Sequence, residues 1–134
     1  MYEILIVGGG PAGLTAAIYA ARAGKRVAVL ERGSTGGQIT SAPLVENYPG
    51  IPSVSGTELA RQMTEQACTF GAEIVYTEAV GLEKTPAGFR VLCTDGVREA
   101  KTVILATGAA HRQLGLPGET TLVGCGISYC AVCD

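Results

Sequence analysis

The stretch Ile4-Leu5-Ile6-Val7-Gly8-Gly9-Gly10-Pro11-Ala12-Gly13 joins an apolar run to a glycine cluster and a proline. The apolar run predicts a buried strand, and Pro11 suits the first turn of a helix, where its missing N–H would have no partner. Gly8, Gly10 and Gly13 give the spacing Gly-x-Gly-x-x-Gly between the two elements. At this spacing Gly8 allows a tight turn, Gly10 lets the backbone approach a pyrophosphate, and Gly13 lets the helix pack closely on the strand. The stretch therefore predicts the phosphate-binding turn of a dinucleotide fold.

The residues after this turn complete a strand–helix–strand unit. The helix is expected to run to about Ala23, with Gly24 as a stop, and Arg26 to Glu31 predicts a second buried strand. Such a unit places its two strands in parallel. Glu31 stands at the end of the second strand, where an acidic residue usually binds the ribose hydroxyls of the adenosine half. A carboxylate there disfavours a 2′-phosphate, so NADP is not expected at this first site.

Further along the chain, the pattern changes from a parallel unit to a series of hairpins. The expected elements are a loop over Gly33–Ser55, a helix over Thr57–Phe70, a strand over Glu73–Tyr76, three antiparallel strands over Ala79–Lys84, Phe89–Thr94 and Val97–Ala100, and a last strand over Thr102–Ala106. Asp95-Gly96 between strand-like runs is a strong hairpin signal. We therefore predict an α/β, Rossmann-like fold in which a small antiparallel β-meander is inserted into a parallel sheet.

The composition excludes several classes of protein. The 134 residues include 19 glycines, and 47% are hydrophobic while 16% are charged. Disorder needs low hydrophobicity with high net charge, and collagen needs a glycine at every third residue. The formal net charge of −2 gives no basic footprint, so neither nucleic acid nor an anionic membrane is expected as a partner.

An uncharged run from Ile4 to Ala21 has about the length of a short membrane span. The glycine cluster and Pro11 interrupt this run, and Glu3 stands where a signal peptide would carry positive charge. We therefore expect neither a signal peptide nor a membrane span. An odd number of cysteines without a signal peptide favours reduced thiols, so we expect a cytoplasmic protein.

Cys130 and Cys133 stand two residues apart, which is the spacing of a redox-active dithiol. A zinc half-site is one alternative, but Cys68 and Cys93 fall on separate predicted elements and do not supply a second pair of ligands. An iron–sulfur cluster is another, because Cys125, Cys130 and Cys133 match the plant-type ferredoxin spacing, although that cluster needs a fourth thiolate. We expect no metal site, and we interpret Cys68 and Cys93 as small buried hydrophobic residues.

Several segments together resemble a known family. They are Gly8–Gly13, Glu31-Arg32-Gly33, Gly36-Gly37-Gln38, Val45–Gly50, Ala106-Thr107-Gly108, Leu116–Glu119 and Gly126–Asp134. In this order they resemble the N-terminal part of the bacterial low-molecular-weight thioredoxin reductases, which are flavoprotein disulfide reductases. The resemblance covers essentially the whole chain from Met1 to Asp134. Cys125 departs from the pattern, because the family often carries a basic residue at that place.

The resemblance implies a Rossmann-like FAD/NAD(P)-binding fold with FAD as the bound nucleotide. The glycine turn would hold the pyrophosphate and Glu31 the adenosine ribose, while Asn47 would reach towards the flavin side and Ala79 towards the adenine. The cofactor-binding residues that it implies are Gly8, Gly10, Pro11, Ala12, Gly13, Glu31, Arg32, Gly33, Gly36, Gly37, Gln38, Asn47, Ala79, Ala106, Thr107 and Gly108.

The resemblance also implies a reaction. NADPH would reduce FAD, and the reduced flavin would pass electrons to the dithiol pair and then to the disulfide of thioredoxin or a thioredoxin-like protein. Cys133 would face the flavin, Cys130 would exchange with the partner disulfide, and Asp134 would donate and accept the proton. The physical requirements agree, since the attacking species is a thiolate and a carboxylate can manage its proton.

Complete members of that family are more than twice as long as this chain, so the fold is expected to be incomplete. Residues 1–115 would form the N-terminal part of the FAD-binding domain, and residues 116–134 a crossover segment that carries the cysteine pair towards an NADPH domain. We expect the 134-residue chain alone to be inactive with NADPH. We also expect a homodimer or other self-association, because sheet edges and apolar surface would be left unpaired.

Two other functions stay open at this point. One is a different flavin dithiol oxidoreductase, such as a peroxiredoxin reductase subunit or a dithiol oxidase, because these share the flavin turn and the cysteine pair. The other is a non-catalytic nucleotide-binding or assembly fragment. The single histidine, His111, has no visible partner in the sequence and is interpreted as a loop residue.

Overall fold

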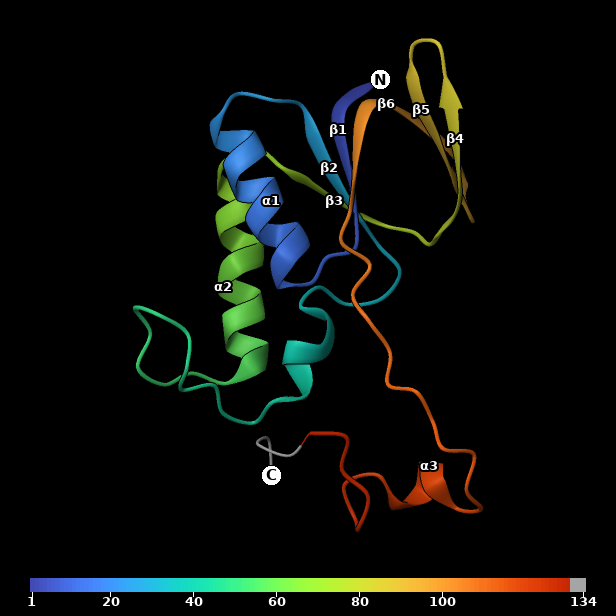
Figure 1. The fold of residues 1–134 in the computed structure, drawn as a ribbon. Coiled ribbons are helices and arrows are strands. Elements are labelled where there is room, and N and C mark those ends of the chain that lie inside the picture. Colours follow the sequence, from blue (N-terminus) through green and yellow to red (C-terminus); the bar gives the residue numbers. More distant parts are fainter. Residues whose placement is uncertain (131–134) are drawn as a thin grey trace.

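The structure is a computed structural model that describes residues 1–130, so Cys133 and Asp134 lie outside the described part. Its elements are β1 Tyr2–Val7, α1 Pro11–Arg22, β2 Val27–Glu31, the 3₁₀ helix η1 Gly37–Ser41, α2 Gly56–Thr69, β3 Glu73–Tyr76, β4 Ala79–Thr85, β5 Gly88–Cys93, β6 Gly96–Leu105 and the short helix α3 Glu119–Leu122. Figure 1 shows their arrangement.

All six strands form one sheet in the order β3-β2-β1-β6-β5-β4. β1 is parallel to β2 and β6, and β2 is parallel to β3, whereas β5 is antiparallel to both of its neighbours. The expected α/β fold with an inserted meander is confirmed. The two strands predicted on either side of Lys101 are instead one, because the first half of β6 pairs with β5 and its second half with β1.

The parallel part of the sheet is buried on both faces. Successive side chains of a strand point to opposite faces, and β1 follows this rule. Ile6 packs with Ala17 of α1, whereas Leu5 packs with Leu30 and with Val91 of the meander. Figure 1 shows α1 and α2 side by side on one face and β4 and β5 away from them. Burial on both faces explains why β1 and β2 read as continuous apolar runs.

The start of α2 and its buried face follow from the sequence. Ser55 caps the helix, since its Oγ accepts a hydrogen bond from the N–H of Glu58 at 3.2 Å. The core-facing side chains recur every four residues along the helix: Leu59, Met63 and Ala67.

The two isolated cysteines have different surroundings. Cys93 ends β5 and is buried where the meander packs against the parallel strands, as expected. Cys68 is exposed, so the expectation that it is buried is wrong. Each residue of an α-helix is turned by about 100° from the one before it, and Cys68 therefore points away from the core that holds Ala67.

Two long connections leave the layered core. Between β2 and α2, η1 is followed by a turn that two isolated bridges close, Val45 with Val54 and Tyr48 with Ile51. After β6, residues 106–118 run away from the sheet as an irregular, exposed segment that leads to α3 (Figure 1). Within the described residues, no helix is both long and apolar enough to cross a membrane.

Candidate functional site

The glycine turn follows β1 and lies against the end of β6. The N–H of Gly8 donates to the carbonyl of Leu30 at 2.9 Å, and the N–H of Ala106 donates to the carbonyl of Val7 at 2.8 Å. Gly8 has a φ of +107°, and a Cβ placed there would lie 2.2 Å from the carbonyl oxygen of Ala106. Only glycine fits this crossing, as the sequence predicts.

Gly13 and Gly10 differ in what surrounds them. A Cβ at Gly13 would lie 1.9 Å from the carbonyl oxygen of Gly8, so Gly13 allows the close packing of α1 on the turn. A Cβ at Gly10 would meet nothing nearer than the carbonyl oxygen of Gly36, at 4.0 Å. The space that a side chain would fill at Gly10 is therefore free of protein atoms, which is what a pyrophosphate needs for close approach.

The N-terminus of α1 faces this free space. Gly10 is its N-cap and Pro11 its first residue, and no side chain of the described residues caps the helix there. The first turn of α1 contains no acidic residue. Its amide N–H groups and the positive end of the helix dipole are therefore available to an anion.

Glu31 ties the turn to the end of β2. Its Oε2 accepts a hydrogen bond from the N–H of Gly9 at 2.7 Å, and its Oε1 accepts one from the N–H of Gly33 at 2.9 Å. Each carboxylate oxygen has a second lone pair, so the group can still accept hydrogen bonds from hydroxyls. The carboxylate thus positions the turn beside the place where we expect the ribose.

A second glycine loop lies on the first. The N–H of Gly36 donates to the carbonyl of Gly9 at 2.7 Å, and the Cβ position of Gly37 lies 3.4 Å from Cα of Gly10. The side-chain amide of Gln38 donates to the carbonyl of Ala109. The structure therefore brings the predicted residues of three separate segments together around Gly10.

Three further predicted binding residues, Arg32, Asn47 and Ala79, lie in or beside other connections of the chain. The connection into Ala79 is fixed at the end of β2, because the N–H of Thr77 donates to the carbonyl of Glu31 at 2.9 Å. Arg32 pairs with Glu78 at 3.8 Å, so it lies beside the same connection. Asn47 lies in the exposed turn between Val45 and Val54. Its expected role towards the flavin stays a prediction.

The segment that carries the predicted redox cysteines ends the described part of the chain. Cys130 is disulfide-bonded, and its backbone is held by Ser128. Ser128 Oγ accepts from the N–H of Cys130 at 3.2 Å and donates to its carbonyl at 2.9 Å. The catalytic roles expected for Cys133 and Asp134 fall on residues outside the described part. No group of three or more potential metal ligands occurs among residues 1–130.

Glu119 belongs to one of the segments that carry the family resemblance, but no role was expected for it, and it is only 3% exposed. Its carboxylate accepts hydrogen bonds from the hydroxyl of Tyr129 and from the N–H groups of Leu114, Gly115 and Leu116. These bonds lower the pKa of Glu119, the tyrosine hydroxyl most of all, and the carboxylate in turn raises the pKa of Tyr129. An acid beside a glycine in an irregular segment carries no pattern that would have revealed this role.

His111 also has a partner that the sequence did not indicate. Its ring stacks on the ring of Tyr129, with centroids 4.8 Å apart and an angle of 5° between the planes. The side chain is exposed and lies in an irregular segment, as expected for a loop residue.

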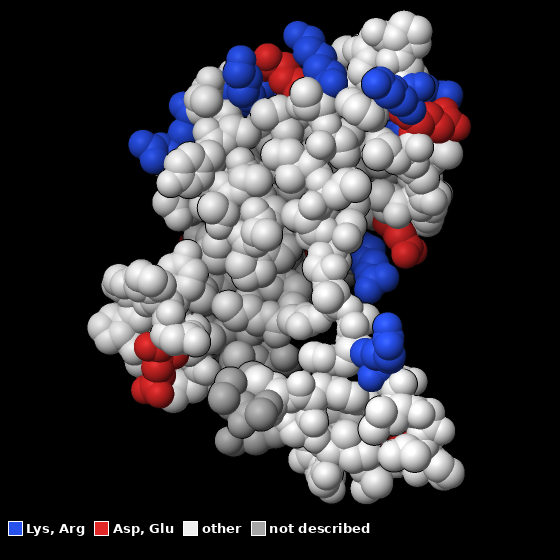
Figure 2. Space-filling view, viewed as in Figure 1, with Lys and Arg blue, Asp and Glu red and all other residues white. Residues whose placement is uncertain are grey.

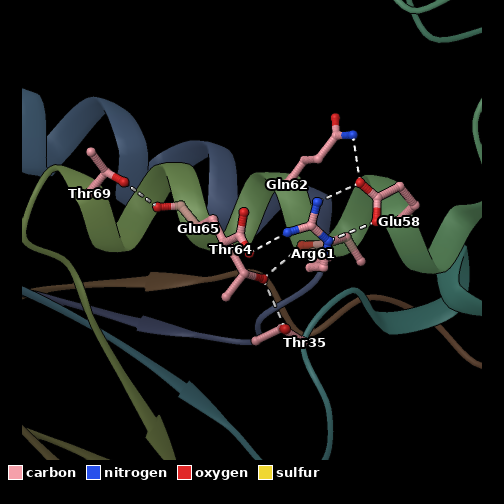
Figure 3. A network of polar contacts seen from close by, with 8 residues as sticks. Thr35, Glu58, Arg61, Gln62, Thr64, Glu65 and Thr69 are labelled. Atoms are coloured by element: carbon pink, nitrogen blue, oxygen red, sulfur yellow. Dashed lines mark hydrogen bonds and ion pairs between the residues drawn. The ribbon is translucent and has the colours of Figure 1, made fainter.

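An open hollow of about 440 Å³ lies between η1 and α2. It is lined by Ser34, Thr35, Thr40, Thr57, Ala60, Arg61, Thr64 and Glu65. Figure 3 shows that several of its polar groups already have partners: Arg61 reaches both Glu58 and Glu65, and Thr64 Oγ1 bonds Thr35 Oγ1 at 2.9 Å. The glycine turn, with unused amide donors, is the better candidate for a nucleotide site.

Comparisons with known proteins agree with this geometry. The family model for pyridine nucleotide-disulphide oxidoreductases matches residues 2–134. The chain is 47% identical to the thioredoxin reductase of Treponema pallidum, with 99% of this chain and 44% of that protein covered. It is 43% identical to the thioredoxin reductase of Bacillus subtilis, with 100% and 42% covered.

Solved structures give the same picture. The thioredoxin reductase of Streptococcus pyogenes aligns with a TM-score of 0.89 at 49% identity, covering 100% of this chain and 44% of that one. That of Lactococcus lactis aligns with a TM-score of 0.87 at 42% identity and the same coverage. The expected resemblance to thioredoxin reductases is confirmed, and the chain spans less than half the length of these relatives. By the match over nearly all of its residues, the chain belongs to the pyridine nucleotide-disulphide oxidoreductase family.

Proposed function

We propose that the protein acts as an FAD-dependent thioredoxin disulfide reductase, which passes electrons from NADPH through FAD and the Cys130/Cys133 pair to thioredoxin. The observation that carries the proposal is a phosphate cradle at Gly10 in the same chain as a disulfide-bonded Cys130. Identity of 42–49% with thioredoxin reductases supports it. Since the chain spans under half of these relatives, the activity is proposed for the whole protein.

The residues around Gly10 fit FAD. The N–H groups at the start of α1 would bind the pyrophosphate, and Glu31 would accept hydrogen bonds from the adenosine ribose. The loop from Gly36 to Gln38 would cover the cofactor from the other side. When bound, the flavin would accept two electrons from a nicotinamide and make them available for the reduction of a disulfide.

The chain's own thiols would carry the exchange. Cys130 as a thiolate would attack the disulfide of thioredoxin, and the mixed disulfide would then be resolved by Cys133. Asp134 would donate and accept the proton that this exchange moves. These roles are part of the proposal and concern residues at and beyond the end of the described part.

Partner and assembly are proposed in the same way. A thioredoxin-like protein disulfide is the proposed substrate, because the relatives are thioredoxin reductases. We propose a reducing compartment such as the cytoplasm, where this exchange has a continuous electron supply. A homodimer is proposed because exposed strands and apolar side chains need covering.

The electron donor is one point at which the proposed reaction could differ from that of other flavin dithiol enzymes. One structural relative, described as a ferredoxin-flavin thioredoxin reductase from Clostridium acetobutylicum, aligns with a TM-score of 0.77 at 34% identity. Donor choice is therefore part of the test. A peroxiredoxin reductase or a dithiol oxidase would share the cradle and the thiols but differ in the substrate used.

The test measures NADPH oxidation by the complete purified protein with oxidised thioredoxin. We expect thioredoxin-dependent turnover that Cys130→Ser abolishes while the flavin absorbance is retained. Cys125→Ser is the matched control, because Cys125 is a free, exposed thiol of the same segment, and it should keep full turnover. Turnover with reduced ferredoxin or with a peroxiredoxin, and none with NADPH and thioredoxin, would replace the proposal by one of the alternatives.

A further inference from the structure

The segment before Cys130 is held by polar and aromatic contacts more than by apolar burial. Leu114 and Leu116 expose 76% and 55% of their surface, and most of residues 106–130 are exposed. A segment with so little buried apolar surface has little to fix its conformation. Glu119 is the one fully buried polar residue in it.

Glu119 closes this segment on itself. Its two oxygens accept the N–H of Leu114 at 2.9 Å, of Gly115 at 2.7 Å and of Leu116 at 3.1 Å, together with the hydroxyl of Tyr129. Hydrogen bonds to a charged acceptor are about twice as strong as neutral ones. One carboxylate therefore ties the chain before α3 to the residue that directly precedes Cys130.

Tyr129 is fixed at its ring as well as at its hydroxyl. The His111 ring lies against it at 4.8 Å, nearly parallel. Stacked aromatic pairs contribute more stability than the area that they bury accounts for. Two anchors on one rigid ring restrict both its position and its rotation, and Ser128 adds two bonds to the backbone of Cys130.

We propose that Glu119, Tyr129 and His111 form a positioning unit for the redox disulfide, which fixes the backbone at Cys130 and so sets how readily this disulfide is reduced. The inference rests on the proposed function, in which Cys130 is the exchanging thiol. The unit is present with Cys130 in its disulfide-bonded state. In this proposal the contacts are stronger around the disulfide-bonded Cys130 than around its reduced thiol, so by linkage they favour the oxidised form.

Loss of the unit should therefore make the disulfide easier to reduce. Tyr129→Phe keeps the ring and its stacking but removes the bond to Glu119. We expect the equilibrium constant for reduction to rise about three- to tenfold, which is a rise of about 15–30 mV in midpoint potential at 29.6 mV per tenfold. His111→Ala should act in the same direction, and His111→Phe, which can still stack, should restore most of the wild-type value.

The experiment equilibrates the protein in glutathione or dithiothreitol redox buffers and counts free thiols after acid quenching. Tyr19→Phe is the matched control, because Tyr19 lies exposed on α1, and its potential should equal that of wild type. Potentials of Tyr129→Phe and His111→Ala within a few millivolts of wild type, or no rescue by His111→Phe, would overturn the positioning role. If the wild-type protein itself shows no reducible disulfide, the proposed function fails instead, since this readout needs neither NADPH nor thioredoxin.

Discussion

Gly13 is the residue at which the glycine turn has the least room. A methyl group there would lie 1.9 Å from the carbonyl oxygen of Gly8 and 3.3 Å from Cγ2 of Ile6. Since both neighbours belong to the buried start of the fold, the backbone would have to shift. We expect Gly13→Ala to lower the free energy of unfolding by about 1–3 kcal/mol, measured by urea denaturation. An unchanged urea midpoint would contradict the close packing.

Gly10 is the residue at which an added side chain should affect binding without affecting folding. Its Cβ position has no neighbour nearer than 4.0 Å, and its φ of −75° suits any residue. Serine is also a favourable N-cap, so Gly10→Ser should keep the stability within about 0.5 kcal/mol.

The serine side chain would, however, occupy the space proposed for the pyrophosphate. We therefore expect Gly10→Ser to weaken FAD binding at least tenfold, about 1.4 kcal/mol, in a titration of the complete protein followed by flavin fluorescence. Wild-type affinity in the variant would mean that the nucleotide binds elsewhere. Together, the Gly13 and Gly10 substitutions separate the folding role of the turn from its binding role.

At the scale of an element, α2 carries a pH dependence that can be traced to one ion pair. Figure 3 shows Arg61 between Glu58 and Glu65 on the exposed side of the helix. Arg61 Nε donates to Glu58 Oε2 at 2.7 Å, and this pairing lowers the pKa of Glu58 to about 2. An unfolded glutamate titrates near 4.3, so the carboxylate favours the folded state above that pH.

This contribution disappears as the pH falls from about 4.5 towards 2, because Glu58 then takes up a proton in the unfolded chain first. We expect Glu58→Gln to flatten part of the fall in stability between about pH 4.5 and pH 2, followed by urea midpoints at each pH. Glu46→Gln is the control, since no ion pair of Glu46 is found in the part of the chain that the structure describes. The effect should be small, because exposed pairs are screened by solvent.

The elements that the sequence predicted well are those whose signals are local. β1, α1 and β2 follow from an apolar run, a glycine turn with Pro11 and a terminal acid, all within about 30 residues. The meander follows from Asp95-Gly96, which lies at the turn between β5 and β6; Gly96 is the first residue of β6. The continuity of β6 was missed, because its length is set by two partners, β5 and β1, that lie elsewhere in the sequence.

The candidate site shows the same contrast between local signals and contacts that are distant in the sequence. The glycine turn and Glu31 were predicted because a fixed spacing joins them. The contacts of Glu119 with Tyr129 and of His111 with Tyr129 join irregular segments, in which no periodicity relates one residue to the other. Such contacts depend on the path of the chain in space, so a sequence pattern could not have predicted them.

At the scale of the whole molecule, the chain combines a packed α/β core with a loosely attached segment, residues 106–130. The sheet is covered by α1 and α2 on one face and by the meander on the other, whereas residues 106–130 are mostly exposed and contact the rest at points such as the hydrogen bond from Gln38 to Ala109. Figure 2 shows the lower part of the molecule mostly without charged side chains, in contrast to the mixed charges at the top.

The exposed apolar side chains at the end of β6 and in the segment that follows it should make the 134-residue chain self-associate. Leu105, Leu114 and Leu116 are 65%, 76% and 55% exposed, and a leucine buried in an interface contributes about 1.5–3 kcal/mol. We expect light scattering to show a mass that rises with concentration. The double variant Leu114→Lys, Leu116→Lys should raise the dissociation constant at least tenfold.

The backbone bonds to Glu119 do not involve these side chains, so the double variant should still fold. Tyr19→Ser removes a similarly exposed apolar residue from α1 and should leave the association unchanged. A monomer at every concentration would show that this segment does not drive assembly. The same conclusion would follow if Tyr19→Ser raised the dissociation constant as much as the double variant does.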